Sequence, residues 1–213
     1  MQIHDDILGT LGNTPLVALR RYHPEGALVA AKLEFFNPGA SVKDRIGIEM
    51  IEAAEREGKL RPGMTVVEPT SGNTGVGLAL ACILRGYKLI CTATTKMSQE
   101  KIGVLEAHGA RVVICPVDVD ADDPRSYYKV AERISRDEGA FLPYQYHNLA
   151  NPEAHYRSTG PEIWQQTDGK VTHWVAGIGT GGTISGVARY LKEKNPAIRC
   201  IGVDPVGSIY AYW

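Results

Sequence analysis

The sequence predicts an α/β protein in which parallel-rich open sheets are flanked by helices. Short β-branched apolar runs alternate with stretches of helical periodicity over most of the 213 residues, a pattern that indicates βαβ units and a parallel sheet. Glycine-rich or small polar loops follow two of the predicted strands. In open parallel sheets ligands bind beyond the carboxyl ends of the strands, so we look for chemistry in these loops.

The predicted elements follow one another regularly until residue 139. Pro124 lies just inside the start of one helix, and Gly109 ends another. The segment 139–152, rich in Pro, Asn, Tyr and His, interrupts the alternation, so we expect one lobe at 1–145 and a second at 146–213; the extreme N-terminal strands could pack on the second lobe. We expect strands at 65–67, 88–92, 111–115, 171–176 and 199–203, and helices at 41–57, 76–85, 98–108, 124–137 and 183–194.

Composition excludes several classes of protein. A net charge of −1 argues against a dedicated nucleic-acid binder. The longest apolar stretch, 76–84, is far shorter than the ~20 residues that span a bilayer, and the acidic start is not typical of a secretory signal. The four cysteines form no C-x-x-C pair and the six histidines are scattered, so we expect buried free thiols, a reducing cytoplasm and no metal site.

A lysine stands at the start of the first predicted helix. Ser41 is the expected N-cap, which places Lys43 in the first turn, where the helix dipole disfavours a cation. Such a lysine loses its proton more easily, above all when it is partly desolvated, and a neutral amine suits Schiff-base or general-base chemistry. The alternative is an ordinary exposed lysine whose ammonium reaches water.

Two loops offer backbone and hydroxyl donors at helix starts. The loop 68–75 combines three hydroxyls and an amide with glycines, which suits a carboxylate or phosphate; a simple capping turn is the alternative. The loop 177–183 lets its backbone approach an anion closely. Its Gly177-x-Gly179-x-x-Gly182 spacing, followed by Asp204, also fits a dinucleotide fingerprint, so a nicotinamide-dependent oxidoreductase stays open at this point.

The ordered set of motifs resembles the fold-type-II pyridoxal-phosphate (PLP) enzymes, in particular the cysteine synthase and cystathionine β-synthase family. The motifs cover nearly the whole chain. They are GNTPL at 12–16, NPGASVKDR at 37–45, PTSGNTG at 69–75, Gln145, NPEAHY at 151–156 and GTGGT at 179–183.

This resemblance implies a two-lobed fold and a role for each matching residue. Lys43 would bind PLP covalently and act as the general base on the substrate Cα, while Asn73 would hydrogen-bond the ring hydroxyl of the cofactor. The substrate carboxylate would be held by Thr70, Ser71, Gly72, Asn73, Thr74 and Gln145, and the cofactor phosphate by Gly179, Thr180, Gly181, Gly182 and Thr183. The expected partners are amino-acid and thiol substrates, with no nucleic acid and no membrane, and the resemblance implies a homodimer.

Two activities of the family compete for this chain. One joins serine, or an activated serine, to homocysteine, and the other joins O-acetylserine to sulfide. Three stretches favour the cystathionine β-synthase type: 96–101, 123–133 with its Tyr127-Tyr128 pair, and 204–209. Helix packing explains the tyrosine pair more simply than substrate contact does. The family has further strands and a Ser or Thr that contacts the pyridine nitrogen beyond the position matching Trp213, so we expect an incomplete second lobe here.

Overall fold

The structure is a computed structural model that describes residues 1, 3–21 and 26–208. The chain forms two compact units, which we describe separately. Unit 1 consists of Met1–Leu11 and Asn37–Asn148, and unit 2 of Gly12–Phe36 and Leu149–Trp213. Both contain parallel strands and helices, so the predicted α/β class with parallel sheets is confirmed. Ile209, with which the last family-like stretch ends, lies outside the described residues, as do 211–213.

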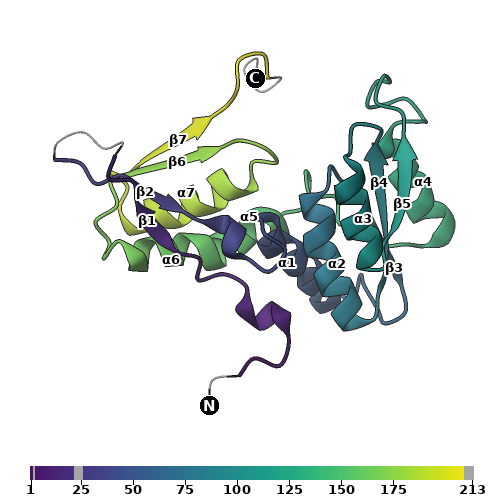
Figure 1. Cartoon of the computed structure of the whole chain (residues 1–213), viewed down its shortest axis with the longest axis horizontal. Coiled ribbons are helices and arrows are strands. Elements are labelled where there is room, and N and C mark those ends of the chain that lie inside the picture. The colour runs from purple at the N-terminus through teal and green to yellow at the C-terminus, as the bar shows by residue number, and fades with distance from the viewer. Residues whose placement is uncertain (2, 22–25, 209–213) are drawn as a thin grey trace. The chain divides into compact units, whose positions relative to one another are not determined.

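Unit 1 is built around a three-stranded parallel sheet in the order β3-β4-β5. Figure 1 shows α2 and α3 on one side of this sheet and α4 on the other. The core between sheet and α4 is apolar: Val67, Ile90, Ala131 and Ala140 are buried together. The elements are η1 (Ile7–Thr10), α1 (Lys43–Arg56), β3 (Thr65–Pro69), α2 (Asn73–Arg85), β4 (Lys88–Thr94), α3 (Gln99–Ala107), β5 (Arg111–Cys115) and α4 (Tyr127–Glu138).

Helices α1 and α2 approach each other through two glycines. A Cβ added to Gly47 would lie 2.5 Å from the carbonyl carbon of Gly77, and one added to Gly77 would lie 2.7 Å from the carbonyl oxygen of Lys43. Real Cβ atoms do not come that close, so glycine is required at both positions for these backbones to touch. The contact places the first turn of α1 directly against α2.

Three predicted helix starts are corrected. Helix α2 begins at Asn73, three residues before the predicted start at 76, so the end of the predicted loop 68–75 forms its first turn. Val42, not Ser41, is the N-cap of α1, although the Ser41 hydroxyl still accepts a hydrogen bond from the Lys43 N–H at 3.1 Å. Helix α4 begins at Tyr127, so Pro124 lies outside it. The reason is that the Ser126 hydroxyl accepts the Lys129 N–H and so caps the helix after the proline.

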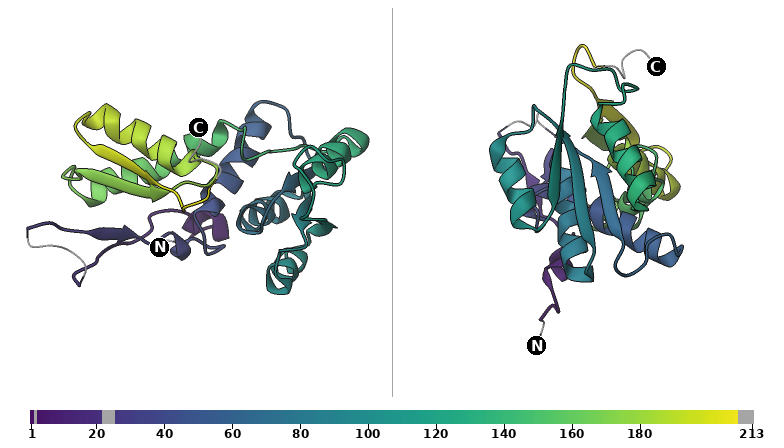
Figure 2. Two further views of the ribbon diagram at one scale, coloured as in Figure 1. Left: turned by 90° about the horizontal axis from the view of Figure 1, so that it is seen from above. Right: turned by 90° about the vertical axis from the view of Figure 1, so that its right-hand side faces the viewer.

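Unit 2 contains a parallel pair of strands, β6 and β7, joined by α7, and a separate antiparallel pair, β1 and β2. Its core is Ile163, Val187, Leu191 and Ile198, and the left view of Figure 2 shows the helices of this unit beside β6 and β7. The elements are β1 (Leu16–Ala18), β2 (Ala30–Lys32), η2 (Glu34–Phe36), α5 (Ala150–Ala154), the π-helix η3 (His155–Thr159), α6 (Gly160–Gln166), β6 (His173–Gly177), α7 (Gly182–Lys194) and β7 (Arg199–Val203).

The chain from Ala150 to Gln166 is helical in three successive elements, which the sequence pattern did not predict. A π-turn interrupts the helical periodicity by which such a segment would be recognised. The antiparallel strands are tied to this helical segment by the Lys32 ammonium, which lies 2.6 Å from the Glu162 carboxylate and donates to the Thr14 carbonyl at 2.8 Å.

Other expectations about the chain can be compared with the described residues. Cys82, Cys91 and Cys115 are buried free thiols as predicted, and Cys200 is a half-buried one. Within the described ranges, no three His, Cys, Asp or Glu side chains are grouped so that they could hold a metal ion. Among the helices of the described chain, none is both long and apolar enough to cross a membrane.

Candidate functional site

Lys43 is the first residue of α1 and is half-buried. Burial lowers the pKa of its ammonium below the ordinary lysine value. In the part of the chain that the structure describes, no ion pair or hydrogen bond engages Nζ. The nearest acid in sequence, Asp44, directs its carboxylate to the Gly39 N–H (2.6 Å) and the Ser41 hydroxyl (3.3 Å) instead. The arrangement favours a neutral amine without a counter-ion, which is the state needed for bonding to a carbonyl or removing a proton.

The loop between β3 and α2 is held in shape by its own hydroxyls. The Thr70 hydroxyl accepts from the Gly72 N–H at 3.1 Å and from the Gly75 N–H at 3.3 Å. Gly72 has a φ of 132°, a conformation that L-residues with a side chain rarely adopt. Ser71 and Asn73 are exposed at the start of α2. The loop therefore presents polar side chains and helix-start amides in a fixed geometry.

Two predicted site residues far apart in the sequence meet in unit 1. The Thr74 hydroxyl donates to Oε1 of Gln145 at 2.7 Å, and both side chains are buried. Gln145 is held in turn by Glu68, whose carboxylate accepts the Tyr144 N–H at 2.7 Å and the Gln145 N–H at 3.0 Å. Residues of β3, of α2 and of the segment before unit 2 thus converge at one end of the sheet.

An aromatic group lies beside Gln145. The Tyr128 ring centroid is 4.1 Å from that of Tyr127, 6.5 Å from that of Tyr144 and 6.1 Å from that of Tyr146. Burial raises the pKa values of Tyr127 and Tyr128, so both phenols are neutral near pH 7. Tyr128 therefore packs against the two residues that flank Gln145 and against Tyr127, and this packing accounts for the pair without a substrate.

In unit 2, the predicted phosphate loop leads into α7. Gly181 is the N-cap of this helix with a φ of 81°. Cβ atoms added to Gly177, Gly179 or Gly181 would meet nothing within 4 Å, so the loop backbone borders open space. The first hydrogen bond into the turn runs from the Ser185 N–H to the Gly181 carbonyl. The preceding amides of α7 are directed out of the helix end, the usual way in which proteins bind phosphate.

Buried polar side chains of the segment 151–155 hold this loop through hydrogen bonds to its threonines. The Asn151 amide donates to the Thr180 hydroxyl at 2.8 Å. The His155 ring, which is 1% exposed, lies between two hydroxyls, with Nδ1 2.9 Å from Thr159 Oγ1 and Nε2 3.1 Å from Thr183 Oγ1. The NPEAHY motif thus supports the GTGGT motif within unit 2.

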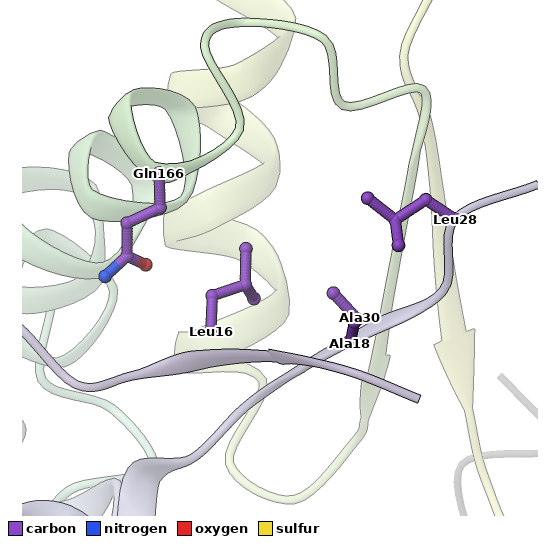
Figure 3. A pocket seen from close by; sticks show the side chains of 5 residues that line it. All are labelled: Leu16, Ala18, Leu28, Ala30 and Gln166. Carbon is purple, nitrogen blue, oxygen red and sulfur yellow. The ribbon is translucent and has the colours of Figure 1, made fainter. Parts of the chain in front are cut away.

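Unit 2 also contains a hollow of about 330 Å³, shown in Figure 3, which lacks the chemistry of a catalytic site. The side chain of Gln166 is already engaged, because it donates to the Thr14 carbonyl at 2.9 Å and accepts from the Lys32 ammonium at 3.0 Å. The remaining lining is aliphatic: Leu16, Ala18, Leu28 and Ala30.

Unit 1 thus offers a partly buried amine suited to a carbonyl group, and unit 2 an open glycine loop suited to a phosphate. The comparison with known families is specific. The chain belongs to the family of pyridoxal-phosphate dependent enzymes, whose family model matches residues 7–212. Members of this family are PLP-dependent enzymes, so the family predicted from the motifs is confirmed and the nicotinamide alternative loses its support.

Curated relatives carry two names. The chain is 52% identical to a cystathionine beta-synthase of Rattus norvegicus over 99% of its own length and 38% of the relative's. It is 47% identical to a cysteine synthase of Staphylococcus aureus over 96% of its own length and 66% of the relative's. The chain therefore spans about two fifths of the length of the cystathionine beta-synthases and about two thirds of that of the cysteine synthases.

Solved structures show the same fold. An O-ureido-L-serine synthase matches with a TM-score of 0.93 at 35% identity, over 99% of this chain and 66% of that one. A hydrogen sulfide-producing enzyme of Fusobacterium nucleatum matches with a TM-score of 0.90 at 38% identity, over 98% of this chain and 68% of that one. These neighbours are fold-type-II PLP enzymes, which confirms the predicted fold type.

The residues of each unit fit PLP. In unit 1, Lys43 offers an amine with a lowered pKa and without a counter-ion among the described residues. In unit 2, the open backbone around Gly179 and the start of α7 offer the donors that a phosphate requires. Both features come from the folded chain and do not depend on the family match.

Three residues near the site had no role in the sequence-based prediction. Glu68 is the first residue of the predicted loop 68–75, where it was given no role; the structure places it in β3, where it is a carboxylate beside two valines. Asn151 and His155 were visible only as parts of a family-like motif. What they contact, Thr180 and Thr183, became known from the fold.

Proposed function

We propose that the full-length protein catalyses PLP-dependent β-replacement on L-serine, or an activated serine, with a thiol. The observation that carries this proposal is the lone, half-buried Lys43 amine at the start of α1, packed against α2 through Gly77. The same helix α2 begins with Asn73 and Thr74, the predicted contacts of cofactor and substrate. A proton acceptor and a carboxylate-binding loop are thereby built on two helices in direct contact.

PLP, when bound, supplies an electron sink that makes the substrate Cα proton acidic. Lys43 would hold the cofactor, then take the Cα proton and return one when the thiol has added. Asn73 would donate to the ring hydroxyl, and the loop 70–74 with Gln145 would orient the substrate through its carboxylate. The donors of 179–183 would hold the cofactor phosphate. Because each role needs a fixed donor or base, binding and orientation account for most of what the chain supplies.

For the second substrate we propose homocysteine, which makes the activity that of a cystathionine β-synthase. The higher identity to that group, 52% against 47%, supports this choice. The identification rests on family likeness, and sulfide is the competing acceptor. A cytoplasmic homodimer completes the proposal, its two lobes divided close to the predicted residue 145, with the N-terminal strands in the second lobe. The three buried free thiols are compatible with a reducing compartment.

The proposal is tested with the full-length protein and its Lys43→Ala variant. We expect a cofactor absorbance band in the visible region that is lost in the variant but kept in Lys59→Ala, which removes an exposed lysine of the same unit. A product assay with L-serine, homocysteine and sulfide in competition then identifies the acceptor. Absence of the band in the unaltered protein would refute the PLP function, and cysteine as the main product would refute the cystathionine β-synthase assignment.

A further inference from the structure

Glu68 is a fully buried carboxylate at the end of β3 that the proposed mechanism does not use. Its two oxygens take different backbone donors: Oε2 accepts the Tyr144 N–H at 2.7 Å, and Oε1 accepts the Gln145 N–H at 3.0 Å. Tyr144 has a φ of 55°, so the chain turns there through a left-handed conformation that non-glycine residues seldom adopt. The carboxylate therefore joins β3 to a strained turn 76 residues further along the chain.

No cation of the described residues compensates this charge. The titratable groups that face it are the Cys91 thiol opposite on β4, the Tyr127 phenol of α4 and the Tyr144 phenol of the turn itself. All three are acids that are neutral near pH 7, because burial raises their pKa values. The ionised Glu68 is thus stabilised mainly by the two backbone N–H groups, and to a smaller extent by the Gln145 side chain.

The turn that Glu68 holds carries the Gln145 side chain toward α2. Gln145 is 6% exposed, and its Oε1 accepts the Thr74 hydroxyl at 2.7 Å. A shift of the Gln145 backbone would change the position of the amide and of the hydroxyl together. Both groups belong to the proposed binding loop for the substrate carboxylate.

We propose that Glu68 is a positioning residue that fixes Gln145, and through it Thr74, for binding of the α-carboxylate of the amino-acid substrate. This inference rests on the proposed function. Glu68 does not touch the substrate; it acts by accepting two backbone N–H groups at once, which the ionised carboxylate does best. A glutamine in its place turns a donor toward one of these N–H groups and loses that hydrogen bond, and a protonated Glu68 accepts it only weakly through its hydroxyl oxygen.

Burial raises the pKa of Glu68 to about 7 in spite of the two backbone donors and the Gln145 side chain. Its ionisation therefore changes near neutral pH. Above pH 7 the ionised side chain holds the turn, and below pH 7 the protonated one holds it less well. A pH dependence of substrate affinity should follow, and it should disappear when Glu68 is replaced by an uncharged isostere.

The test compares the full-length protein with Glu68→Gln, Gln145→Ala and the double variant; Glu55→Gln, the same change on the outer part of α1, is the matched control. A hydrogen bond to a charged group is strong enough to change affinity about tenfold. We expect Glu68→Gln to raise KM for L-serine about tenfold at pH 8.5 with kcat within about threefold. The ratio of KM values should fall toward one at pH 6, where the unaltered protein is itself protonated.

Two further measurements separate positioning from general damage. Adding Glu68→Gln to Gln145→Ala should raise KM less than twofold, since its effect passes through Gln145. Hydrogen exchange of the 142–148 segment, measured without substrate, should be faster in Glu68→Gln and unchanged in Glu55→Gln. If Glu68→Gln does not fold, Glu68→Asp replaces it in the same set of single and double variants. Its shorter side chain keeps the charge but places it further from the two N–H groups of the turn.

The outcomes distinguish the inference from the proposed function. If the unaltered protein has a cofactor band that L-serine does not change, the proposed substrate is wrong. If L-serine does change the band, three results would overturn the inference. They are an unchanged KM in Glu68→Gln, a ratio of KM values that does not depend on pH, and an effect of Glu68→Gln on KM that is as large in the Gln145→Ala background as in the unaltered protein.

Discussion

Replacing Gly77 by alanine should separate α1 from α2 and move Lys43. The new Cβ would lie 2.7 Å from the Lys43 carbonyl oxygen and 2.9 Å from the Asp44 Cα, whereas ordinary contacts begin at 3.4 Å. The first turn of α1 must therefore move by about 0.7 Å, which is the difference between 3.4 Å and the 2.7 Å to the Lys43 carbonyl oxygen. Overpacking of this kind costs about 1–3 kcal/mol, and the better helix propensity of alanine returns up to ~1 kcal/mol of it. The expected net loss of unfolding free energy is about 1–2 kcal/mol.

Gly103 provides the matched control, because it lies exposed in α3 and an added Cβ meets nothing within 4 Å. Gly103→Ala should stabilise the protein by about 0.5–1 kcal/mol. Urea unfolding of both variants, followed by circular dichroism, should show changes in the unfolding free energy of opposite sign relative to the unaltered protein. Displacement of Lys43 should also lower kcat/KM of Gly77→Ala by about tenfold or more, since small misplacements of reacting groups are costly. A Gly77→Ala variant as stable and as active as the unaltered protein would refute the close-packing argument.

Three further predictions concern single positions. The pKa of Glu68 is raised to about 7 in the folded protein, so the unfolding free energy should fall by on the order of 3 kcal/mol as the pH rises from about 4.5 to 7. In Glu68→Gln this fall of stability with pH should be absent, as measured by thermal unfolding at several pH values. In Gly182→Ala the added Cβ would overlap the Asn151 amide, so the affinity for PLP should fall at least tenfold, measured by titrating the cofactor-free protein; unchanged affinity would contradict the assigned phosphate loop. Ser126→Ala removes the cap of α4 and should cost about 1 kcal/mol of unfolding free energy in urea; a loss below ~0.3 kcal/mol would show that the cap is dispensable.

The buried Glu68 carboxylate lowers the stability of the fold but fixes the position of the turn at Tyr144. Burying its charge opposes folding as the pH rises, yet the same charge holds the turn at Tyr144. Conformational strain and buried charge are both more common at functional sites than elsewhere. As the pH rises through neutrality, stability should therefore fall while the affinity for substrate rises, so KM falls as well.

The local pattern was sufficient to predict the regular elements of unit 1. The strands at β3, β4 and β5 and the helices between them follow from apolar periodicity, because burial on one face imposes that period. The helix starts were less well predicted. Ser41 and Ser126 are both capping residues by type, and only the backbone geometry decides which neighbour becomes the N-cap.

The sequence by itself determined the chemistry: a lysine at a helix start, a small polar loop and a glycine loop, in an order that indicates PLP enzymes. Tertiary structure alone decided which of these groups are in contact. Glu68 and Gln145 are 77 residues apart, and Thr74 reaches Gln145 across 71. A hydrogen bond between such distant residues leaves no periodicity in the sequence, because it depends on where the sheet brings their backbones. For the same reason, the sequence indicated only that the pKa of Lys43 would be lowered if its side chain were desolvated. That Lys43 is in fact partly buried became known from the fold.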